Sequence, residues 1–268
     1  MALIRLDHVP DSIGVNVPVN LILPDPGKMQ GIPVSDRKVL YLLHGLSDDG
    51  SAWQRYTSIE VYANDHGMVV VMPSFGRSFY VDQPNGQKYF TYMVEELPQY
   101  LSDVFHIAPK RENTFIAGNS MGGYGAFKAA FLHPEKYQMA LSLSGVLSLA
   151  ILDNHEDKRQ PEFEHLFGDL SKLASSEHDP AVWIKSAIEK KINLPRLFIA
   201  CGKQDDLYPL SLMFHSACQA AGFEVDYQEE DAQHDWYYWD KVMRWFIEEI
   251  IDPKASGSQI EGVMVDEC

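Results

Sequence analysis

Short apolar runs alternate along the chain with longer stretches of mixed apolar and polar residues. The runs are nearly continuous, which is typical of strands buried on both faces of a parallel sheet. They lie at residues 39–43, 68–72, 114–117, 139–143, 196–200 and 224–228. Helical stretches lie between or after them, at about 53–66, 90–105, 122–132, 181–190, 209–221 and 236–250. This rhythm predicts a single α/β domain over residues 1–252, with a mostly parallel central sheet and helices on both faces.

Three segments depart from this rhythm. Residues 12–23 alternate between apolar and polar side chains and predict antiparallel edge strands at the start of the sheet. Residues 147–180 form a long polar connection. The sequence is consistent with either a lid-like insertion or a plain surface excursion there. Residues 253–268 are polar and predict a flexible or extended tail.

The sequence Gly118-Asn119-Ser120-Met121-Gly122 directly follows the apolar run 114–117 and precedes the helical stretch 122–132. A Gly-x-Ser-x-Gly pattern between a strand and a helix is the nucleophile elbow of serine hydrolases. The glycines are needed because the turn is sharp and the serine adopts a strained backbone. Ser120 is therefore the candidate nucleophile.

A serine nucleophile needs a general base and an acid that orients it, and in elbow folds these follow in the order Ser, Asp/Glu, His. Asp205 stands one short turn beyond the strand at 196–200, and Asp206 is its rival. Of the ten histidines, His234 is the one placed in a loop after the acid and before a helix. The expected triad is Ser120, Asp205 and His234.

The tetrahedral intermediate of acyl transfer also needs two backbone N–H donors for its oxyanion. The residue after the nucleophile, Met121, is expected to supply one of them. The other is expected from Leu46, in the loop Leu42-Leu43-His44-Gly45-Leu46 that follows an early strand. His44 is expected to shape this loop and not to transfer protons.

Aromatic side chains near these loops are candidates for substrate contact. Trp53, Tyr80 and Trp236 are chosen together with residues of the 147–180 excursion. Packing in the core or on the surface is an equally good reading of any single aromatic residue.

Composition narrows the class of protein. The net charge of −16 excludes a basic surface for nucleic acid and disfavours anionic membranes. No apolar segment is long enough to span a bilayer, and the N-terminus lacks the apolar core of a signal peptide. Three cysteines without CxxC spacing indicate neither a disulfide framework nor a zinc site, and no metal ligand set is expected. A reducing cytoplasm is the simplest location.

Taken together, these motifs resemble the esterase D-like group of α/β-hydrolases, and within it the bacterial tributyrin esterases of the EstA type. The resemblance rests on the His-Gly loop at 42–46, the elbow at 118–126, Cys201-Gly202-Lys203-Gln204-Asp205 and His234-Asp235-Trp236-Tyr237-Tyr238-Trp239. It extends over roughly residues 10–250. Two departures are Asn119, where relatives often carry His or Leu, and Ala232-Gln233, where a glycine is common.

The resemblance implies an α/β-hydrolase fold, a serine carboxylesterase acting on short acyl esters, no cofactor, and often a homo-oligomer. Three alternatives stay open. The acyl-enzyme could pass to an alcohol or sugar, as in an acyltransferase. It could form from a thioester, as in S-formylglutathione hydrolases. Less plausibly, because no triad member is missing, the fold could serve as a non-catalytic binding protein.

Overall fold

Eight strands form one sheet in the order β1-β2-β4-β3-β5-β6-β7-β8 in the computed structural model, which describes residues 1–84, 86–154 and 156–253. The strands are β1 (Ala2–His8), β2 (Val17–Leu23), β3 (Lys38–Leu43), β4 (Met68–Pro73), β5 (Thr114–Asn119), β6 (Met139–Leu143), β7 (Arg196–Gly202) and β8 (Val225–Glu230). The strands from β4 to β8 in this order pair in parallel, and β2 pairs antiparallel with both β1 and β4. The predicted α/β-hydrolase fold, with a mostly parallel central sheet, is confirmed.

The antiparallel edge is confirmed in β2, but the sequence pattern did not predict β1. Residues of β1 are exposed or half-buried throughout. An edge strand without a buried face leaves no apolar run in the sequence, so its pairing with β2 is visible only in the structure.

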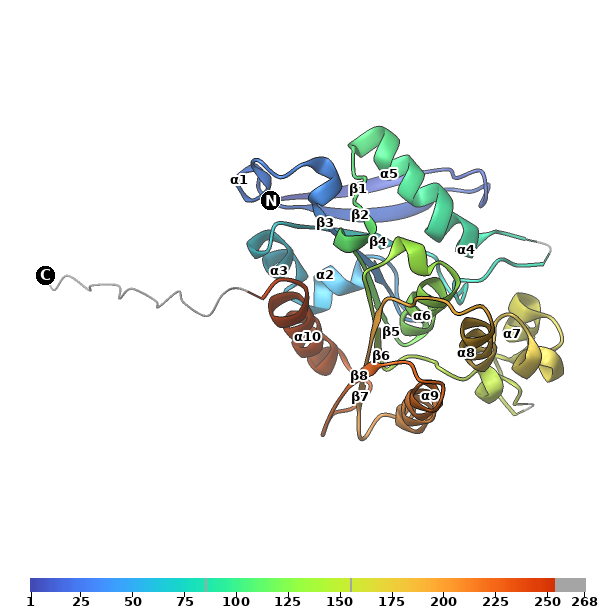
Figure 1. The fold of residues 1–268 in the computed structure, drawn as a ribbon. Helices are drawn as coiled ribbons and strands as arrows, with labels where there is room; N and C mark the ends of the chain where they lie inside the picture. The colour runs from blue at the N-terminus through green and yellow to red at the C-terminus, as the bar shows by residue number, and fades with distance from the viewer. Residues whose placement is uncertain (85, 155, 254–268) are drawn as a thin grey trace, which may run out of the picture.

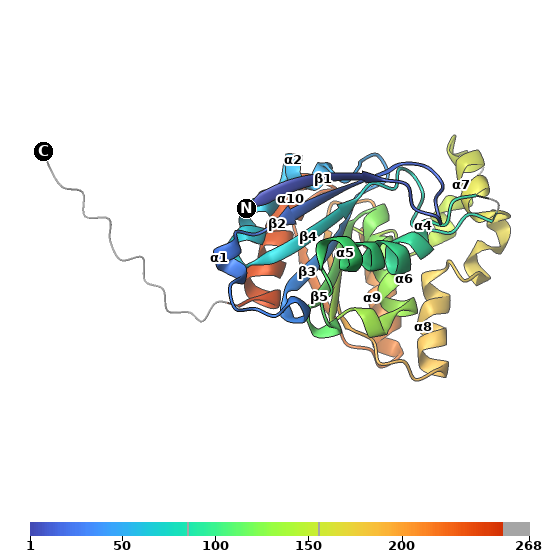
Figure 2. The ribbon, with the colours of Figure 1, turned by 90° about the horizontal axis from the view of Figure 1, so that it is seen from above.

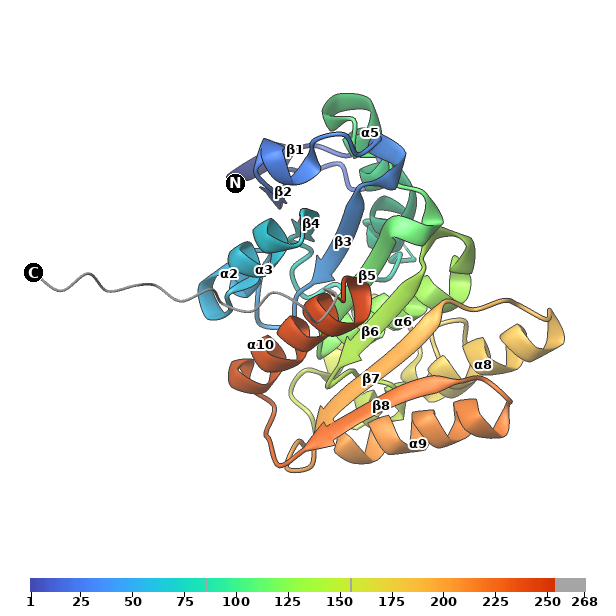
Figure 3. The same cartoon turned by 60° about the vertical axis from the view of Figure 1, so that its left-hand side comes forward.

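Helices cover both faces of the sheet (Figure 1). They are α1 (Pro26–Met29), α2 (Ala52–Tyr56), α3 (Ile59–Asp65), α4 (Tyr89–Thr91), α5 (Leu97–Phe105), α6 (Met121–Leu132), α7 (Gln160–Phe167), α8 (Pro180–Glu189), α9 (Tyr208–Ala220) and α10 (Trp236–Trp245). Figure 3 shows α2, α3 and α10 on one side of the strands and α6, α8 and α9 on the other. None of the described helices has both the length and the apolar character required to cross a membrane.

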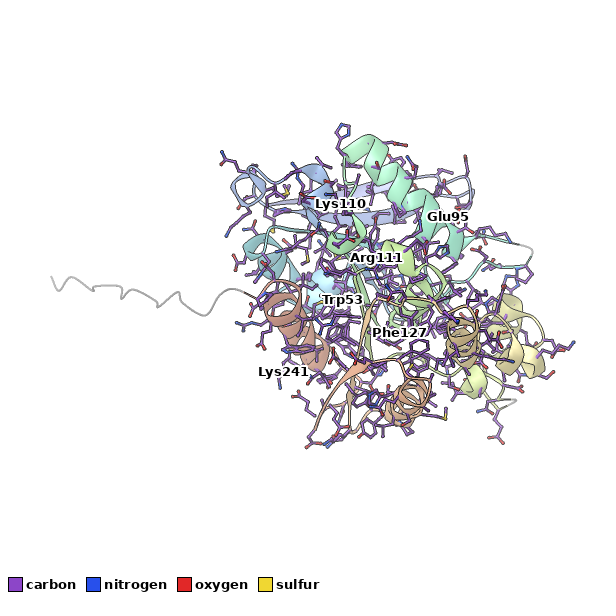
Figure 4. All side chains as sticks on the ribbon, viewed as in Figure 1. Trp53, Glu95, Lys110, Arg111, Phe127 and Lys241 are labelled. Atoms are coloured by element: carbon purple, nitrogen blue, oxygen red, sulfur yellow. The ribbon has the colours of Figure 1, made fainter. Side chains whose placement is uncertain are left out.

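Successive residues of the central strands point into two separate cores, as the pleat of a strand requires. Along β3, Val39, Tyr41 and Leu43 pack into the core beneath α5, α6 and α8. Leu40 and Leu42 pack into the opposite core, beneath α2, α3 and α10. Figure 4 shows Trp53 and Phe127, which belong to the two different cores, inside the fold. Burial on both faces explains why these strands appear as continuous apolar runs.

The helix predicted at about 53–66 is wrong as a single element, because the chain breaks it between α2 and α3. Thr57 adopts an extended backbone, and its hydroxyl donates to the carbonyl of Trp53. The Ile59 N–H then donates to the Thr57 hydroxyl at 3.2 Å. A side-chain hydroxyl that replaces helical hydrogen bonds in this way ends one helix and starts the next.

The 147–180 excursion contains two short 3₁₀ turns (Leu149–Leu152 and Leu170–Ser175) and α7, and it ends where α8 begins. Figure 2 shows α7 at the end of the molecule opposite α1. Its buried leucines and Phe163 belong to the main core, and polar contacts also attach it to the body of the protein. Arg77, after β4, forms an ion pair with Glu162 of α7, and the Tyr124 hydroxyl of α6 donates to the His178 carbonyl at 2.9 Å.

The folded protein is expected to lose stability in acid because of the His178 imidazole. Burial, together with the nearby Lys128 ammonium, lowers the pKa of His178 to about 4, although Asp82 acts in the opposite direction. An unfolded histidine has a pKa of about 6.5, so the unfolded chain binds the proton first as the pH falls. The stabilisation is therefore complete above about pH 6.5 and is lost towards pH 4.

We expect the melting temperature of the wild-type protein to fall more between pH 7 and pH 5 than that of His178→Leu, which has no imidazole to protonate. Differential scanning fluorimetry at both pH values measures the difference. Equal falls would show that His178 does not couple protonation to stability.

Candidate active site

Ser120 stands between the end of β5 and the start of α6, in the backbone conformation that the elbow requires. Its φ is 54° and its ψ is −117°, a region that costs an L-residue conformational energy. The Ser120 N–H donates to the Leu143 carbonyl at 2.8 Å, and its carbonyl accepts the N–H groups of Gly123 and Tyr124. The strained turn is therefore held from both sides, by β6 and by the first turn of α6.

The elbow glycines allow backbone segments to approach each other closely. A Cβ on Gly118 would lie 2.5 Å from backbone atoms of Gly122. A Cβ on Gly122 would lie 2.5 Å from the Leu43 carbonyl oxygen and 2.9 Å from that of His44. These neighbours are main-chain atoms, which cannot turn away as a side chain can.

We expect Gly122→Ala to lower the melting temperature by roughly 2–12 °C, since overpacking costs about 1–3 kcal/mol and each kcal/mol shifts the melting temperature of a domain of this size by about 2–4 °C. Gly27→Ala is the matched control, because no atom lies within 4 Å of the added Cβ and Gly27 is in a helix. Thermal unfolding of both variants measures the effect. A Gly122→Ala protein as stable as the Gly27→Ala protein would contradict the packing argument.

Asp205 and His234 form a hydrogen-bonded pair at the ends of β7 and β8. His234 Nδ1 lies 2.8 Å from Asp205 Oδ2, and the other carboxylate oxygen accepts the Leu207 N–H at 2.8 Å. Burial alone would raise the pKa of Asp205, but hydrogen bonds from His234, Ser144 and Leu207 outweigh it and lower the pKa. An ionised Asp205 accepts the Nδ1 proton, which leaves Nε2 of a neutral His234 free to accept one.

The two loops that carry this pair are tied together by their backbones. The Gln204 N–H donates to the Ala232 carbonyl at 3.0 Å, and the Lys203 N–H donates to the Glu230 carbonyl at 2.8 Å. Ala232, one of the departures from the family pattern, therefore takes part in holding the His234 loop against the Asp205 loop. Asp206 is exposed. Among the described residues, the carboxylate that bonds His234 is that of Asp205 and not that of Asp206.

The loop that carries Leu46 is shaped by a buried, neutral His44. His44 Nε2 accepts the Phe75 N–H at 3.0 Å, so its proton must be on Nδ1, which donates to the Gly45 carbonyl at 2.7 Å. Burial lowers the pKa of His44, which favours this neutral form. Both ring nitrogens are occupied by main-chain groups, so His44 shapes the loop as the sequence indicates.

Of the three aromatic residues expected to contact substrate, Trp53 and Tyr80 form hydrogen bonds with the backbone of this loop, and Trp236 packs against Trp53. The Trp53 indole N–H donates to the Leu43 carbonyl at 3.0 Å, and the Tyr80 hydroxyl donates to the His44 carbonyl at 2.8 Å. Trp53 and Tyr80 are fully buried, and Trp236 packs edge-on against Trp53. None of the three lines the cavity that contains Ser120.

That cavity has a volume of about 290 Å³ and brings together residues from six regions of the chain. Its lining contains Leu46, Phe79, Ser120, Met121, Val146, Ile151, Leu152, Arg159, Phe163, Asp205, Asp206, Leu207 and His234. The sequence singled out its polar members and both expected oxyanion donors, together with the 147–180 excursion as a whole. It missed Phe79, whose backbone φ of 49° turns it inward, because no local pattern shows a positive φ at a phenylalanine.

A larger cavity lies away from this chemistry. It has a volume of about 390 Å³, lies between β8 and α10, and is lined largely by charged side chains such as Glu229, Lys241 and Arg244. In the part of the chain that the structure describes, no three His, Cys, Asp or Glu side chains are grouped so that they could hold a metal ion.

The strained elbow serine, the hydrogen bond between the buried Asp205 and His234, and the cavity that these residues share define a serine hydrolase of the α/β-hydrolase fold. The chain belongs to the esterase family described as putative esterase, whose pattern matches residues 11–245.

Relatives within and around this family support the same class. An acetyl esterase from Caldicellulosiruptor saccharolyticus is 29% identical over 254 residues, which cover 91% of this chain and 96% of the relative. An S-formylglutathione hydrolase from Bos taurus is 31% identical over 228 residues, which cover 75% of this chain and 77% of the relative. The solved structure of the Staphylococcus aureus fluorophosphonate-binding serine hydrolase F has a TM-score of 0.84 and 34% identity, and covers 92% of this chain and 96% of that one. The protein is a carboxylic ester hydrolase.

Proposed function

We propose that the protein hydrolyses esters of short acyl chains through an acyl-enzyme formed on Ser120. The single observation that carries this proposal is the cavity in which Ser120 meets the hydrogen-bonded pair of Asp205 and His234. Its volume of about 290 Å³ lies at the small end of ligand pockets, which favours a short acyl group. The likeness to tributyrin esterases favours the same substrate class.

In the proposed mechanism, His234 Nε2 takes the proton of Ser120 as its hydroxyl attacks the ester carbonyl. Asp205 keeps the other ring nitrogen protonated and stabilises the imidazolium that forms. The N–H groups of Leu46 and Met121 stabilise the oxyanion, and Met121, as the first residue of α6, has no N–H partner within the helix. His234 then protonates the leaving alcohol, and water attacks the acyl-enzyme by the reverse sequence.

A series of p-nitrophenyl esters from acetate to long acyl chains tests this function. We expect a rate that peaks at short chains and disappears in Ser120→Ala. A rate that rises steadily with chain length would contradict the short-chain preference, and a rate that persists without Ser120 would contradict the mechanism.

A thioesterase activity on the same residues is the second candidate, supported by the similarity to the S-formylglutathione hydrolase. Comparing kcat/KM for S-formylglutathione and for the best short-chain ester distinguishes the two. An acyltransferase would instead form a new ester when an alcohol acceptor competes with water, which product analysis detects. A homo-oligomer and a cytoplasmic location stay predictions.

A further inference from the structure

The cavity beside Ser120 has an apolar inner wall and an open rim of polar side chains and the exposed Ile151. The inner wall consists of buried side chains, namely Phe79, Met121, Val146, Leu152 and Phe163. The rim contains Arg159, Asp206 and His234, whose side chain is 36% exposed. Because His234 must protonate the leaving group, that group lies on the rim and the acyl chain faces the inner wall.

Arg159 is the one arginine or lysine among the residues that line this cavity. Asp157 holds its guanidinium with two charged contacts, from Nε to Oδ1 at 3.0 Å and from Nη2 to Oδ2 at 2.7 Å. Its guanidinium carbon lies 5.4 Å from the centroid of the Phe163 ring, which belongs to the inner wall. Nη1 makes no hydrogen bond with any described residue, so its two N–H donors are open to a ligand.

The segment that carries Arg159 is supported from the body of the protein. Arg159 immediately precedes α7, and Glu162 in the first turn of α7 accepts hydrogen bonds from both Nε and Nη2 of Arg77, the latter at 2.8 Å. A guanidinium held by Asp157 on an anchored helix is oriented before substrate binds, which reduces the entropy lost on binding.

We propose that Arg159 binds a carboxylate on the leaving group, so that the preferred substrates are short acyl esters or thioesters of a carboxylate-bearing alcohol or thiol. This inference rests on the proposed function. A net charge of −16 and the exposed Asp206 on the same rim would otherwise repel such a substrate. A bound carboxylate therefore needs a local cation, and arginine matches its geometry.

Two esters of closely similar shape, one anionic and one neutral, test the proposal: 4-acetoxybenzoate and 4-acetoxybenzamide. Their leaving groups also differ in acidity, and comparing the ratio of their rates in the wild type with the ratio in a variant cancels that difference. We expect wild-type kcat/KM to be roughly tenfold higher for the benzoate, the effect of one hydrogen bond between charged groups at a partly exposed site. In Arg159→Met the ratio is expected to fall to about one or below, mainly through KM, because binding of the carboxylate is lost. In Asp206→Asn the ratio is expected to rise, and added salt should lower it in the wild type.

The outcomes separate this inference from the function on which it rests. Ser120-dependent hydrolysis of both esters at equal kcat/KM would overturn the role of Arg159 and leave the esterase intact. Hydrolysis of neither ester, nor of any p-nitrophenyl ester, would instead overturn the proposed function.

Two further results would overturn the inference. In one, Arg159→Met lowers kcat/KM for the benzoate and the benzamide equally, so that their ratio stays as in the wild type. That result would show that Arg159 has a purely structural role. The other is a preference for a carboxylate on the acyl group, measured as 4-nitrophenyl hemisuccinate over 4-nitrophenyl butyrate, which would place the anion on the wrong side of the ester bond. Melting curves confirm that each variant is folded.

Discussion

Replacing Ser120 or His234 by alanine is expected to lower ester turnover by at least about 10⁴-fold, because members of a triad act as a unit. Without Ser120 no acyl-enzyme forms, and without His234 nothing removes the serine proton during attack. Steady-state hydrolysis of p-nitrophenyl butyrate measures the loss. Ser216→Ala, an exposed serine of α9, is the matched control and should keep the wild-type rate.

Both triad variants should stay folded, because the alanine side chain fits wherever serine or histidine did and Ser120 is only partly buried. Far-UV circular dichroism and melting curves check this. A folded variant that retains near-normal turnover would remove the substituted residue from the mechanism.

Asp205→Asn is expected to lower kcat by about 10⁴-fold, as loss of the triad acid does in serine proteases. An asparagine amide would donate to His234 Nδ1, which favours the tautomer with its proton on Nε2 and removes the charge that stabilises the imidazolium. Asp206→Asn should cost a few-fold at most with a neutral ester, because Asp206 is exposed and makes no hydrogen bond with His234.

The same p-nitrophenyl butyrate assay compares the two carboxylates. The reverse ranking, with Asp206→Asn the more damaging substitution, would show that Asp206 is the acid of the triad.

The positions of the candidate residues directly after predicted strands explain why the triad could be predicted from the sequence. In a parallel sheet the carboxyl ends of all strands meet at one edge, so groups just past those ends come together however far apart they are in sequence. Ser120, Asp205 and His234 follow β5, β7 and β8 respectively. The sequence shows β5 and β7 as apolar runs and predicts a further strand at 224–228. The sequence favours Asp205 and leaves Asp206 as its rival, because one residue of turn decides which carboxylate faces the histidine; the structure places Asp205 there.

The lining of the cavity could not be predicted, because it depends on side-chain directions that leave no pattern. The sequence makes Trp53 and Tyr80 candidates for substrate contact, yet their N–H and O–H groups donate to the carbonyls of Leu43 and His44. Arg159 lies in a polar excursion, and only the position of α7 brings it to the rim of the cavity. Residues of the excursion therefore line the cavity, and the three predicted aromatic residues do not. The sequence indicated the excursion as a whole but none of its individual residues.

The most direct test of Ser120 as the nucleophile is covalent labelling with diethyl p-nitrophenyl phosphate, followed by mass spectrometry. The tryptic peptide 112–128 contains a single serine, Ser120, and fragmentation of the labelled peptide distinguishes it from Thr114 and Tyr124. We predict one diethylphosphoryl group per chain on this peptide, with loss of ester hydrolysis in proportion to labelling. Full inactivation with the label on another residue, or ester hydrolysis that persists after this peptide is fully labelled, would contradict the account.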